Sequence, residues 1–340
     1  MDEKCMAKAY CEQCRDFVDV EIVAAEEITM LDGVPYAYPV HYGVCRHCGG
    51  KATPDEILQE NQRAFIDAVR AHNGIVSQRV IANIPKRYCI GKRPLSKVLG
   101  WGEQTYSRFL DGDVPSRYYS DIIERIGRSP LAYLLVLHSN KEALSKVAFE
   151  KSKRASLQFL MSAGSMIERV AAYILARTGS ASPLALQKEL YYVDGVANAF
   201  LGCPLFFERC EAWVRGPVYP QLWKDLDLRN VREESLFGEE VAQEIEDTFS
   251  ESELVILRAI VTHVACYSPF VLQNITHKES PWLDARAGIS NDEASDAEIT
   301  EDAIKNYFSK IKADYDMQQP SDIGKYMQAM VVRLQEESKL

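Results

Sequence analysis

Apolar residues recur every three or four positions through much of the second half of the chain. The clearest case runs from Leu184 to Leu201, where the apolar side chains fall on one helical face. Gly202 follows, and glycine ends helices readily because it lacks the Cβ that penalises a left-handed residue. The pattern predicts a helix with one buried face. Its apolar positions are Leu186, Leu190, Val193, Ala197 and Leu201.

Two short apolar runs follow this helix. Leu205–Phe207 and Ala212–Val214 have the length of strands and are separated by charged residues. A proline suits the first turn of a helix, where a missing N–H costs least. We therefore predict two strands, a turn at Gly216-Pro217, and a helix that begins at Pro217 and continues through residues 222–226.

The remaining apolar patterns predict an otherwise helical C-terminal half. Residues 141–153 indicate a charged helix or linker, and 157–178 a strongly apolar helix. The acidic residues 239–249 indicate a surface helix or loop, and the polar residues 288–298 an exposed loop. The other predicted helices span 252–265, 270–277, a short segment from Ser280 that contains Trp282, 300–317 and 323–335.

The first fifty residues show alternation instead of helical spacing. Val18, Val20 and Ile22 alternate with polar residues, and a second alternating run spans 36–42. Asp32-Gly33, which lies between these runs, is a common hairpin turn. We predict a long β-hairpin here, followed by a helix over 56–72.

Four cysteines flank this hairpin as two CxxC pairs. Cys11 and Cys14 form one pair, Cys45 and Cys48 the other, with thirty residues between Cys14 and Cys45. Each pair can bring two thiolates to one ion, so the two pairs predict a tetrahedral zinc site in a zinc ribbon. Four thiolates leave no open coordination position, and one structural Zn²⁺ is therefore expected. Reduced structural or redox cysteines are the alternative. Cys5, His41 and His47 are alternative ligands.

The net charge of −10 is unevenly distributed. Between Arg79 and Arg128, ten Lys and Arg stand against five Asp and Glu, which gives +5. Between Leu131 and Leu340, 22 stand against 31, which gives −9. A basic island in an acidic chain suggests that one module meets nucleic acid. A chance fluctuation over so short a segment is the alternative.

This basic segment contains two predicted short helices, over 94–99 and 103–110, with a turn at 100–102. The run LSKVLGWGEQTYSRFLDGD resembles the L-x-x-LG-x-x-x-x-T-x-S-R-x-x-x-G pattern of XRE-type helix-turn-helix domains. The resemblance implies a five-helix DNA-binding domain over 75–139 that acts as a homodimer, completed by helices over 119–126 and 129–138. The predicted small core consists of Leu95, Val98, Leu99, Tyr106 and Phe109.

Residues that point away from this core are the predicted contacts with operator DNA. Gln104 and Arg108 suit sequence readout, because their donors and acceptors match adenine and guanine edges. The other predicted contacts of the second helix are Glu103, Thr105 and Ser107. The predicted phosphate contacts, which position the protein without specifying sequence, are Lys86, Arg87, Lys92, Arg93 and Lys97. A helical hairpin used only for dimer or toxin contacts is the alternative.

Separated motifs in the C-terminal half resemble the Panacea antitoxin domain, also called SocA-like. They are LQK-x-LYY, G-x-PLF and EAW-x-x-GPV-x-P between Leu186 and Pro220, T-H-x-x-x-PW from Thr276 to Trp282, and a closing I-x-x-YF helix that ends at Phe308. The N-terminal segment resembles the YgiT-type zinc finger of MqsA-like antitoxins, including the Cys48-Gly49-Gly50 ending.

The resemblance implies an antitoxin that binds its toxin protein directly and regulates its own operon. No HExxH motif, P-loop or nucleophile elbow is present, so no enzyme is expected. Tyrosine and arginine contribute disproportionately to interfaces. The predicted toxin contacts are Lys188, Tyr191, Tyr192, Arg215 and Tyr219. A proteolytic adaptor that delivers its client to a protease, and a regulator that senses a ligand, are the alternatives.

The predicted organisation is a mainly α, multidomain chain. It consists of a zinc ribbon over 1–53, a connector helix over 54–74, the helix-turn-helix domain over 75–139, a linker helix over 140–156, and a mostly helical α+β domain over 157–340. No apolar run reaches the roughly 18 residues that a membrane span needs. The N-terminus lacks an apolar signal core, so a cytoplasmic protein is expected.

Overall fold

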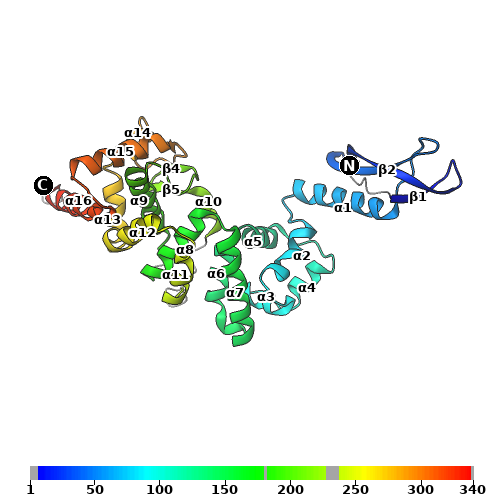
Figure 1. Ribbon diagram of the computed structural model, residues 1–340, viewed down its shortest axis with the longest axis horizontal. Coiled ribbons are helices and arrows are strands. Elements are labelled where there is room, and N and C mark those ends of the chain that lie inside the picture. Colours follow the sequence, from blue (N-terminus) through cyan, green and yellow to red (C-terminus); the bar gives the residue numbers. More distant parts are fainter. Residues whose placement is uncertain (1–6, 180–181, 227–236, 338–340) are drawn as a thin grey trace. The chain divides into compact units, whose positions relative to one another are not determined.

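The computed structural model describes residues 7–179, 182–226 and 237–337 and divides into two compact units (Figure 1). The first unit consists of Met1–Ile84 and Ser107–Glu124, and the second of Pro85–Tyr106 and Arg125–Leu340. The described residues are mainly helical and contain two small antiparallel sheets, as the sequence predicts. None of the described helices is both long and apolar enough to cross a bilayer.

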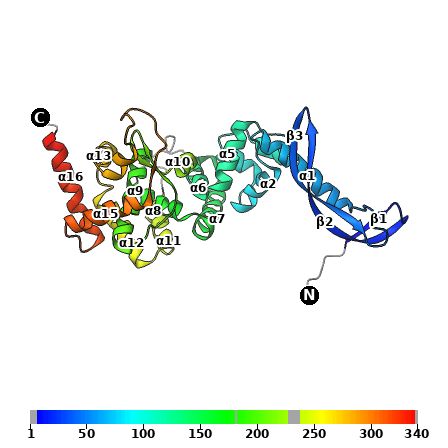
Figure 2. The same cartoon turned by 90° about the horizontal axis from the view of Figure 1, so that it is seen from above.

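The first sheet is dominated by one long hairpin (Figure 2). Strands β1 (Ala7–Cys11), β2 (Asp16–Leu31) and β3 (Val34–Cys45) pair antiparallel in that order. Asp32 and Gly33 form the turn with φ of 50° and 80°. Positive φ at both central residues matches the twist of paired strands. The predicted alternating runs and their turn are confirmed.

Helix α1 (Asp55–His72) packs against β3. The ring of Phe65 on α1 lies 6.2 Å from that of Tyr36 and 5.2 Å from that of Tyr38. The helix predicted over 56–72 is therefore confirmed, and its apolar face covers one side of the hairpin.

Five helices fill residues 78–139: α2 (Gln78–Arg87), α3 (Lys92–Val98), α4 (Thr105–Leu110), α5 (Arg117–Arg128) and α6 (Pro130–Ser139). The two helices predicted around the turn are present as α3 and α4, although α4 begins at Thr105 and not at Glu103. Tyr106 and Phe109 are buried, as predicted. The backbone N–H of Tyr106 donates to Ser96 Oγ at 3.1 Å.

The apolar run predicted as one helix over 157–178 is divided into two. Helix α7 covers Lys146–Ala163 and α8 covers Met166–Thr178. The Ser165 side chain accepts from the N–H of Glu168, whose carboxylate accepts from the N–H of Ser165. This capping box starts a new helix. The prediction of one continuous helix was wrong because the local cap outweighs the apolar pattern. Helix α7 also runs through the predicted boundary at 156.

Helix α10 (Pro220–Asp225) contacts the end of α5. The side chain of Arg128, on α5, forms an ion pair with Asp225, with Nε 3.4 Å from Oδ2. Gln221 Nε2 donates to the same carboxylate at 2.8 Å. Ser129, which follows Arg128, donates its hydroxyl to the buried carboxylate of Glu168 on α8. These contacts lie within the second unit and attach the start of α6 to α8 and α10.

The apolar spacing of helix α9 (Pro183–Leu201) predicts one buried face, but the structure buries this helix on every side. Every residue from Ala185 to Asn198 is buried. Gly195 allows α15 (Glu301–Asp314) to approach closely, since a Cβ at this position would lie 2.3 Å from the Phe308 ring. The elements in contact with α9 are α8, α12 (Glu251–His263), α13 (Pro269–Thr276), α15 and strand β5.

Three polar side chains of α9 bind the neighbouring segment 217–219 inside the core. Lys188 Nζ donates to the Pro217 carbonyl at 2.8 Å, and Gln187 Oε1 accepts from the N–H of Tyr219 at 2.8 Å. The Tyr219 hydroxyl donates to Asp194 Oδ2 at 3.2 Å. Burial lowers the pKa of Lys188 to about 7 and raises that of Asp194 to about 7. Helix α9 thereby holds the backbone at 217–219.

That backbone belongs to the second sheet, whose order is β5–β4–β6. The strands are β4 (Cys210–Trp213), β5 (Gly216–Val218) and β6 (Glu298–Ile299). The turn and helix start predicted at Gly216-Pro217 were wrong, because these residues lie in β5. Pro217 is tolerated there because β5 is an edge strand and needs no donor on its outer side. The helix begins three residues later, at Pro220.

The strand predicted at Leu205–Phe207 was also wrong, since these residues form no strand. Leu205 and Phe206 are buried, whereas the side chain of Phe207 is 81% exposed. Two of the three apolar residues therefore serve the core from an irregular segment.

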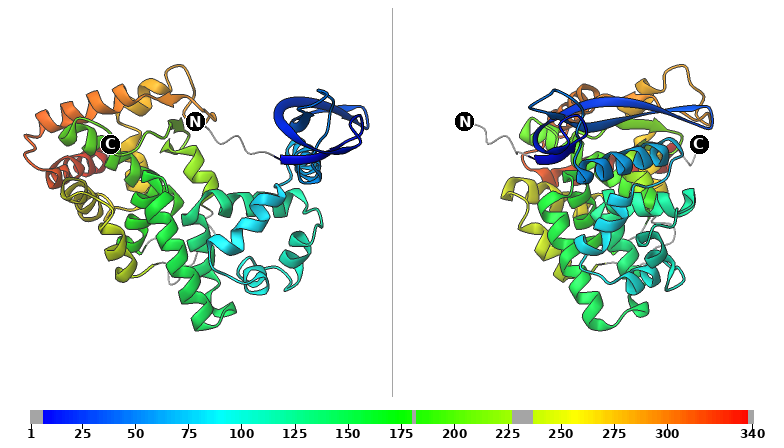
Figure 3. Two further views of the ribbon diagram at one scale, coloured as in Figure 1. Left: turned by 45° about the vertical axis from the view of Figure 1, so that its right-hand side comes forward. Right: turned by 90° about the vertical axis from the view of Figure 1, so that its right-hand side faces the viewer.

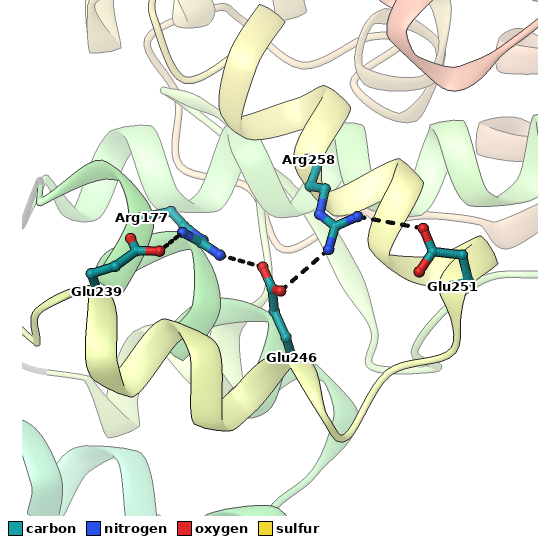
Figure 4. Close-up of polar contacts among 5 residues, drawn as sticks. All are labelled: Arg177, Glu239, Glu246, Glu251 and Arg258. Atoms are coloured by element: carbon teal, nitrogen blue, oxygen red, sulfur yellow. Dashed lines mark hydrogen bonds and ion pairs between the residues drawn. The ribbon is translucent and has the colours of Figure 1, made fainter.

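Helix α11 (Glu239–Glu246) is held by a chain of ion pairs (Figure 4). Arg177 on α8 contacts the carboxylates of Glu239 and Glu246. Arg258 on α12 lies 3.2 Å from Glu246 and 3.4 Å from Glu251. The acidic segment 239–249 is therefore mainly a surface helix, one of its two predicted forms.

The last helices confirm the predicted helical end of the chain (Figure 3). Helix α14 spans Ser280–Ala285, and α15 and α16 (Ile323–Glu337) are the orange and red helices of that figure. Most of residues 288–298 form an irregular, largely exposed segment, as predicted.

The fully buried carboxyl group of Glu279 lies where α9, α15 and α16 meet. Glu279 Oε1 accepts from the hydroxyl of Tyr192 on α9 at 2.7 Å and from that of Tyr326 on α16 at 2.5 Å. Tyr307 on α15 adds a hydroxyl contact of 3.0 Å to Tyr326. Burial raises the pKa of Glu279 to about 7, although the tyrosine hydrogen bonds oppose this shift.

We predict that Glu279→Gln removes part of the pH dependence of stability. The pKa of Glu279 is raised on folding, so its contribution is complete below its ordinary value of 4.5 and is lost as pH rises through about 7. Glutamine imitates the protonated carboxyl, so the variant should gain on the wild type by up to about 1.4 kcal/mol per pH unit in this range. Urea unfolding at several pH values measures the difference. The exposed Glu244→Gln serves as the control, and parallel profiles for wild type and Glu279→Gln would contradict the prediction.

Candidate functional site

The four predicted zinc ligands lie together. The sulfur atoms of Cys11, Cys14, Cys45 and Cys48 are all within 4.8 Å of one another, with 3.5 Å between Cys11 and Cys48 and 3.8 Å between Cys14 and Cys45. Zinc–thiolate bonds of about 2.3 Å in a tetrahedron place sulfur atoms about 3.8 Å apart. The cluster therefore has the size that one such ion requires.

The backbone of each CxxC pair is folded around its cysteine sulfurs. Arg15 and Gly49, which follow the two pairs, have φ of 54° and 74°, and their N–H groups donate to the carbonyls of Cys11 and Cys45. The N–H of His47 points to Cys45 Sγ at 3.4 Å. A thiolate that accepts a backbone N–H is stabilised as the charged form that binds metal. His41 and His47 are not part of the cluster, and Cys5 lies outside the described residues.

The core around this cluster is small. It consists of the buried residues Ala9, Cys11, Val18, Val20, Cys45 and Ala52, two of which are themselves predicted ligands. A core of this size supplies little hydrophobic stabilisation, so the cross-link between β1 and the end of β3 is expected to depend on the metal.

The predicted sequence-reading residues occupy the surface at and just before α4. Gln104 and Glu103 are exposed and precede the helix, Arg108 is exposed on it, and Thr105 and Ser107 are half-buried. Arg108 Nε lies 2.7 Å from Asp113 Oδ2, where both side chains are largely exposed. Exposed ion pairs are weak, so this contact leaves Arg108 available for a stronger partner.

The predicted phosphate-contacting residues divide into two groups. The exposed group consists of Lys86 on α2 and of Lys92, Arg93 and Lys97 on α3. Lys97 Nζ lies 2.8 Å from Glu103 and lowers the pKa of that carboxyl. Arg87 is different, because its guanidinium donates to the Gly127 carbonyl and lies 4.4 Å from the centre of the Phe159 ring. Arg87 thus has a structural role that the sequence does not reveal.

Four of the five predicted toxin contacts are core residues. Lys188, Tyr191, Tyr192 and Tyr219 are at most 1% exposed. A partner could not touch them without displacing α9 or β5, so we correct this part of the expectation. Arg215 is exposed at the β4–β5 turn.

A cavity of about 650 Å³, which the sequence did not reveal, lies beside Arg215. Its size is within the range of sites that bind ligands or partner segments. The apolar lining consists of Leu184, Trp213, Val214, Val218, Trp223 and Ala294. The polar lining consists of Gln187, Glu211, Arg215, Ser295 and Asp296.

Two half-buried tryptophans dominate the cavity wall. The rings of Trp213 and Trp223 meet edge to face with their centres 5.8 Å apart. Trp213 Nε1 donates to Glu211 Oε2 at 2.8 Å, and the Trp213 carbonyl accepts from Trp282 Nε1 at 2.9 Å. The indole N–H and the carbonyl of Trp213 are therefore occupied by the fold, and the residue contributes to the cavity lining.

A separate segment, 290–298, closes one side of the cavity. The buried guanidinium of Arg286 holds it, with donors 2.8 Å from the Ala212 carbonyl and 2.7 Å from that of Glu293. Arg209 adds a bond of 2.9 Å to the Asp296 carbonyl. The segment is thereby tied to β4 by backbone contacts and does not depend on its own apolar residues.

His277 and Glu279 serve the fold. His277 ends α13, and its ring stacks on Trp282 with centres 4.1 Å apart. Burial lowers the pKa of His277 to about 4. Glu279 is occupied by the two tyrosine hydroxyls described above. These positions therefore brace α14 against the core.

Residues 186–283 match the family model described as antitoxin SocA-like, Panacea domain. The match begins in α9 and ends in α14, and thus includes both tryptophans of the cavity. It confirms the predicted resemblance for this segment. No curated protein and no solved structure matches the chain. The zinc-ribbon and helix-turn-helix resemblances remain predictions.

We predict that Cys11→Ser combined with Cys14→Ser releases the metal and unfolds the β1–β3 module. The substitutions remove two of four ligands, and the small core cannot compensate. Elemental analysis of the purified protein measures zinc, and limited proteolysis followed by mass spectrometry locates the unfolded segment. Cys89→Ser combined with Cys266→Ser, at exposed cysteines outside the cluster, should retain the metal. Full zinc retention in the first variant would disprove the ligand assignment.

Proposed function

We propose that this chain is the antitoxin of a toxin–antitoxin pair and neutralises its toxin by direct binding through the C-terminal helical domain. The match of residues 186–283 to the SocA-like Panacea domain carries the proposal. The matched segment contains the central helix α9 and most of the cavity lining, so the resemblance concerns the core of the domain as well as its surface.

We further propose that the chain binds operator DNA through α3 and α4 and thereby regulates its own operon as a homodimer. The support is the exposed basic and amide side chains at these helices, within a segment of net charge +5 from ten basic and five acidic residues. Phosphate contacts would come from α3, and base contacts from Gln104 and Arg108.

The metal proposed for the N-terminal module is one structural Zn²⁺. Four sulfur ligands at tetrahedral spacing suit zinc, and they leave no position for a reacting molecule. The proposed domain order is zinc ribbon, connector helix, DNA-binding helices, linker helix and toxin-binding domain. A cytoplasmic location suits reduced cysteines and a DNA target.

We predict that the product of the reading frame adjacent to this one arrests growth when expressed alone, and that coexpression of this chain restores growth. A stable complex of both proteins should then copurify, because a neutralising antitoxin acts by stoichiometric binding. Loss of the arresting protein from the cell in the presence of this chain would instead indicate a proteolytic adaptor. Absence of arrest would count against the antitoxin function and favour a ligand-sensing regulator.

We predict that Gln104→Ala combined with Arg108→Ala weakens operator binding at least tenfold and leaves neutralisation intact. Each lost base contact costs about 1–3 kcal/mol. Gel shifts at fixed salt with the chain's own upstream DNA measure the effect. Gln328→Ala combined with Arg333→Ala is the matched control, because that exposed arginine also forms a surface ion pair, with Glu337. Unchanged affinity of the first variant would refute DNA reading by these residues.

A further inference from the structure

The tryptophan-lined cavity has the composition of a docking site for another protein. Its apolar wall is half exposed at Trp213 and Trp223, and tryptophan is among the residues that contribute most to protein interfaces. The surrounding polar groups form a rim of the kind that encloses the apolar centre of an interface.

The rim carries negative charge that the fold leaves uncompensated. Asp292, Glu293 and Asp296 are exposed on the segment that closes the cavity, and none has a basic partner among the residues that the structure describes. By contrast, Arg209 lies 3.5 Å from Glu211 and 3.7 Å from Glu298 and offsets those two carboxylates. The lining therefore presents one free carboxylate, and the two neighbouring ones extend the charge beyond the cavity.

Arg215 is the one cation among the lining residues, and it forms no ion pair within the described part of the chain. A single arginine at a turn can meet backbone carbonyls or a carboxylate of a bound segment, since it carries five N–H donors. It does not cancel the three carboxylates of the facing segment.

The site is also organised in advance of binding. Arg286 and Arg209 hold segment 290–298 by bonds to backbone carbonyls, and Gln187 is fixed by the N–H of Tyr219. Little conformational entropy would be lost on binding, and this raises the affinity that a given contact area provides.

We propose that this cavity is the docking site for the toxin, and that it takes an apolar side-chain anchor flanked by Lys or Arg. The proposal rests on the antitoxin function proposed above. The acidic rim extends past the cavity over Asp292 and Glu293, so the charged surface is larger than a small molecule would cover. A basic segment, such as a nucleic-acid-binding surface of the toxin, is the complement of this rim. When this basic segment of the toxin occupies the cavity, it is covered and its function is blocked.

The apolar wall and the acidic rim of the cavity come from different segments of the chain. Trp213, Val214 and Trp223 lie within the segment that matches the Panacea domain, whereas residues 294–296 lie beyond it. The apolar anchor site thus belongs to the matched core, and the charge that selects among basic partners comes from the attached segment.

Two variants of the full chain test the site. Ala294→Trp fills the cavity from an exposed position, and Glu293→Lys combined with Asp296→Lys reverses the rim charge. Ala313→Trp, on an exposed face of α15, is the control for the first. Glu244→Lys combined with Asp247→Lys, an exposed pair with the same spacing at α11, is the control for the second. Thermal unfolding of every variant is measured first, and only variants as stable as the wild type are compared in binding.

The probe is the purified growth-arresting product of the adjacent reading frame, with affinity measured by calorimetry and neutralisation by growth rescue. Both cavity variants should bind at least about tenfold more weakly, which corresponds to about 1.4 kcal/mol, while both controls stay within about twofold. Wild-type affinity should also fall as salt is raised.

Three results would overturn the proposal and can be told apart. If the wild type binds and both cavity variants bind equally well, docking occurs elsewhere and the antitoxin function stands. If the wild type neither binds nor rescues, the proposed function itself fails. If toxin binding is unchanged but Ala294→Trp alone loses a copurifying small molecule in native mass spectrometry, or loses self-association, the cavity belongs to that ligand or to a second copy.

Discussion

Complete burial of α9 is the constraint on which the C-terminal domain depends. A helix enclosed on all sides has no solvent to satisfy its polar groups, and an unpaired buried group costs about 1–3 kcal/mol. Lys188, Gln187 and Asp194 therefore each hold a specific neighbour at Pro217 or Tyr219. These bonds position β5 and the residue that follows it. The same helix holds α16 through the carboxyl of Glu279, which is shared by Tyr192 and Tyr326.

This constraint also shapes the cavity. Its floor is made by Gln187 and Val218, which belong to α9 and to the strand that α9 positions. Its wall includes Trp223 on α10, and Asp225 of the same short helix binds Arg128 of α5. The α5–α6 corner and the cavity wall are thus attached to one helix.

The N-terminal module is built in the opposite way. The buried cluster around its cysteines has six residues, two of them predicted metal ligands. Sulfur atoms from both ends of the hairpin meet in one cluster. Where apolar burial is scarce, a metal cross-link can supply the missing stabilisation, and the proposed zinc would link folding of this module to metal binding. The C-terminal domain needs no such link because its central helix supplies an extensive core.

Local patterns in the sequence determined most elements and the cysteine cluster. The CxxC spacing, the alternation around Asp32-Gly33 and most of the helical runs depend on neighbours within a few residues, and these were confirmed by the structure. The capping box at Ser165 is also a local signal, but the prediction of one helix over 157–178 did not take it into account. Short motifs likewise predicted the family resemblance of the matched segment.

Tertiary structure alone decided which residues are exposed. The tyrosines and Lys188 of α9 have the polar tips of interface residues, yet other elements enclose the whole helix and convert them into core. The cavity was equally hidden, because its lining comes from α9, β4, β5, α10 and a segment some seventy residues further on. Periodicity reports one face of one element. Whether that face is the only buried one depends on what packs around it, and distant parts of the chain supply that packing.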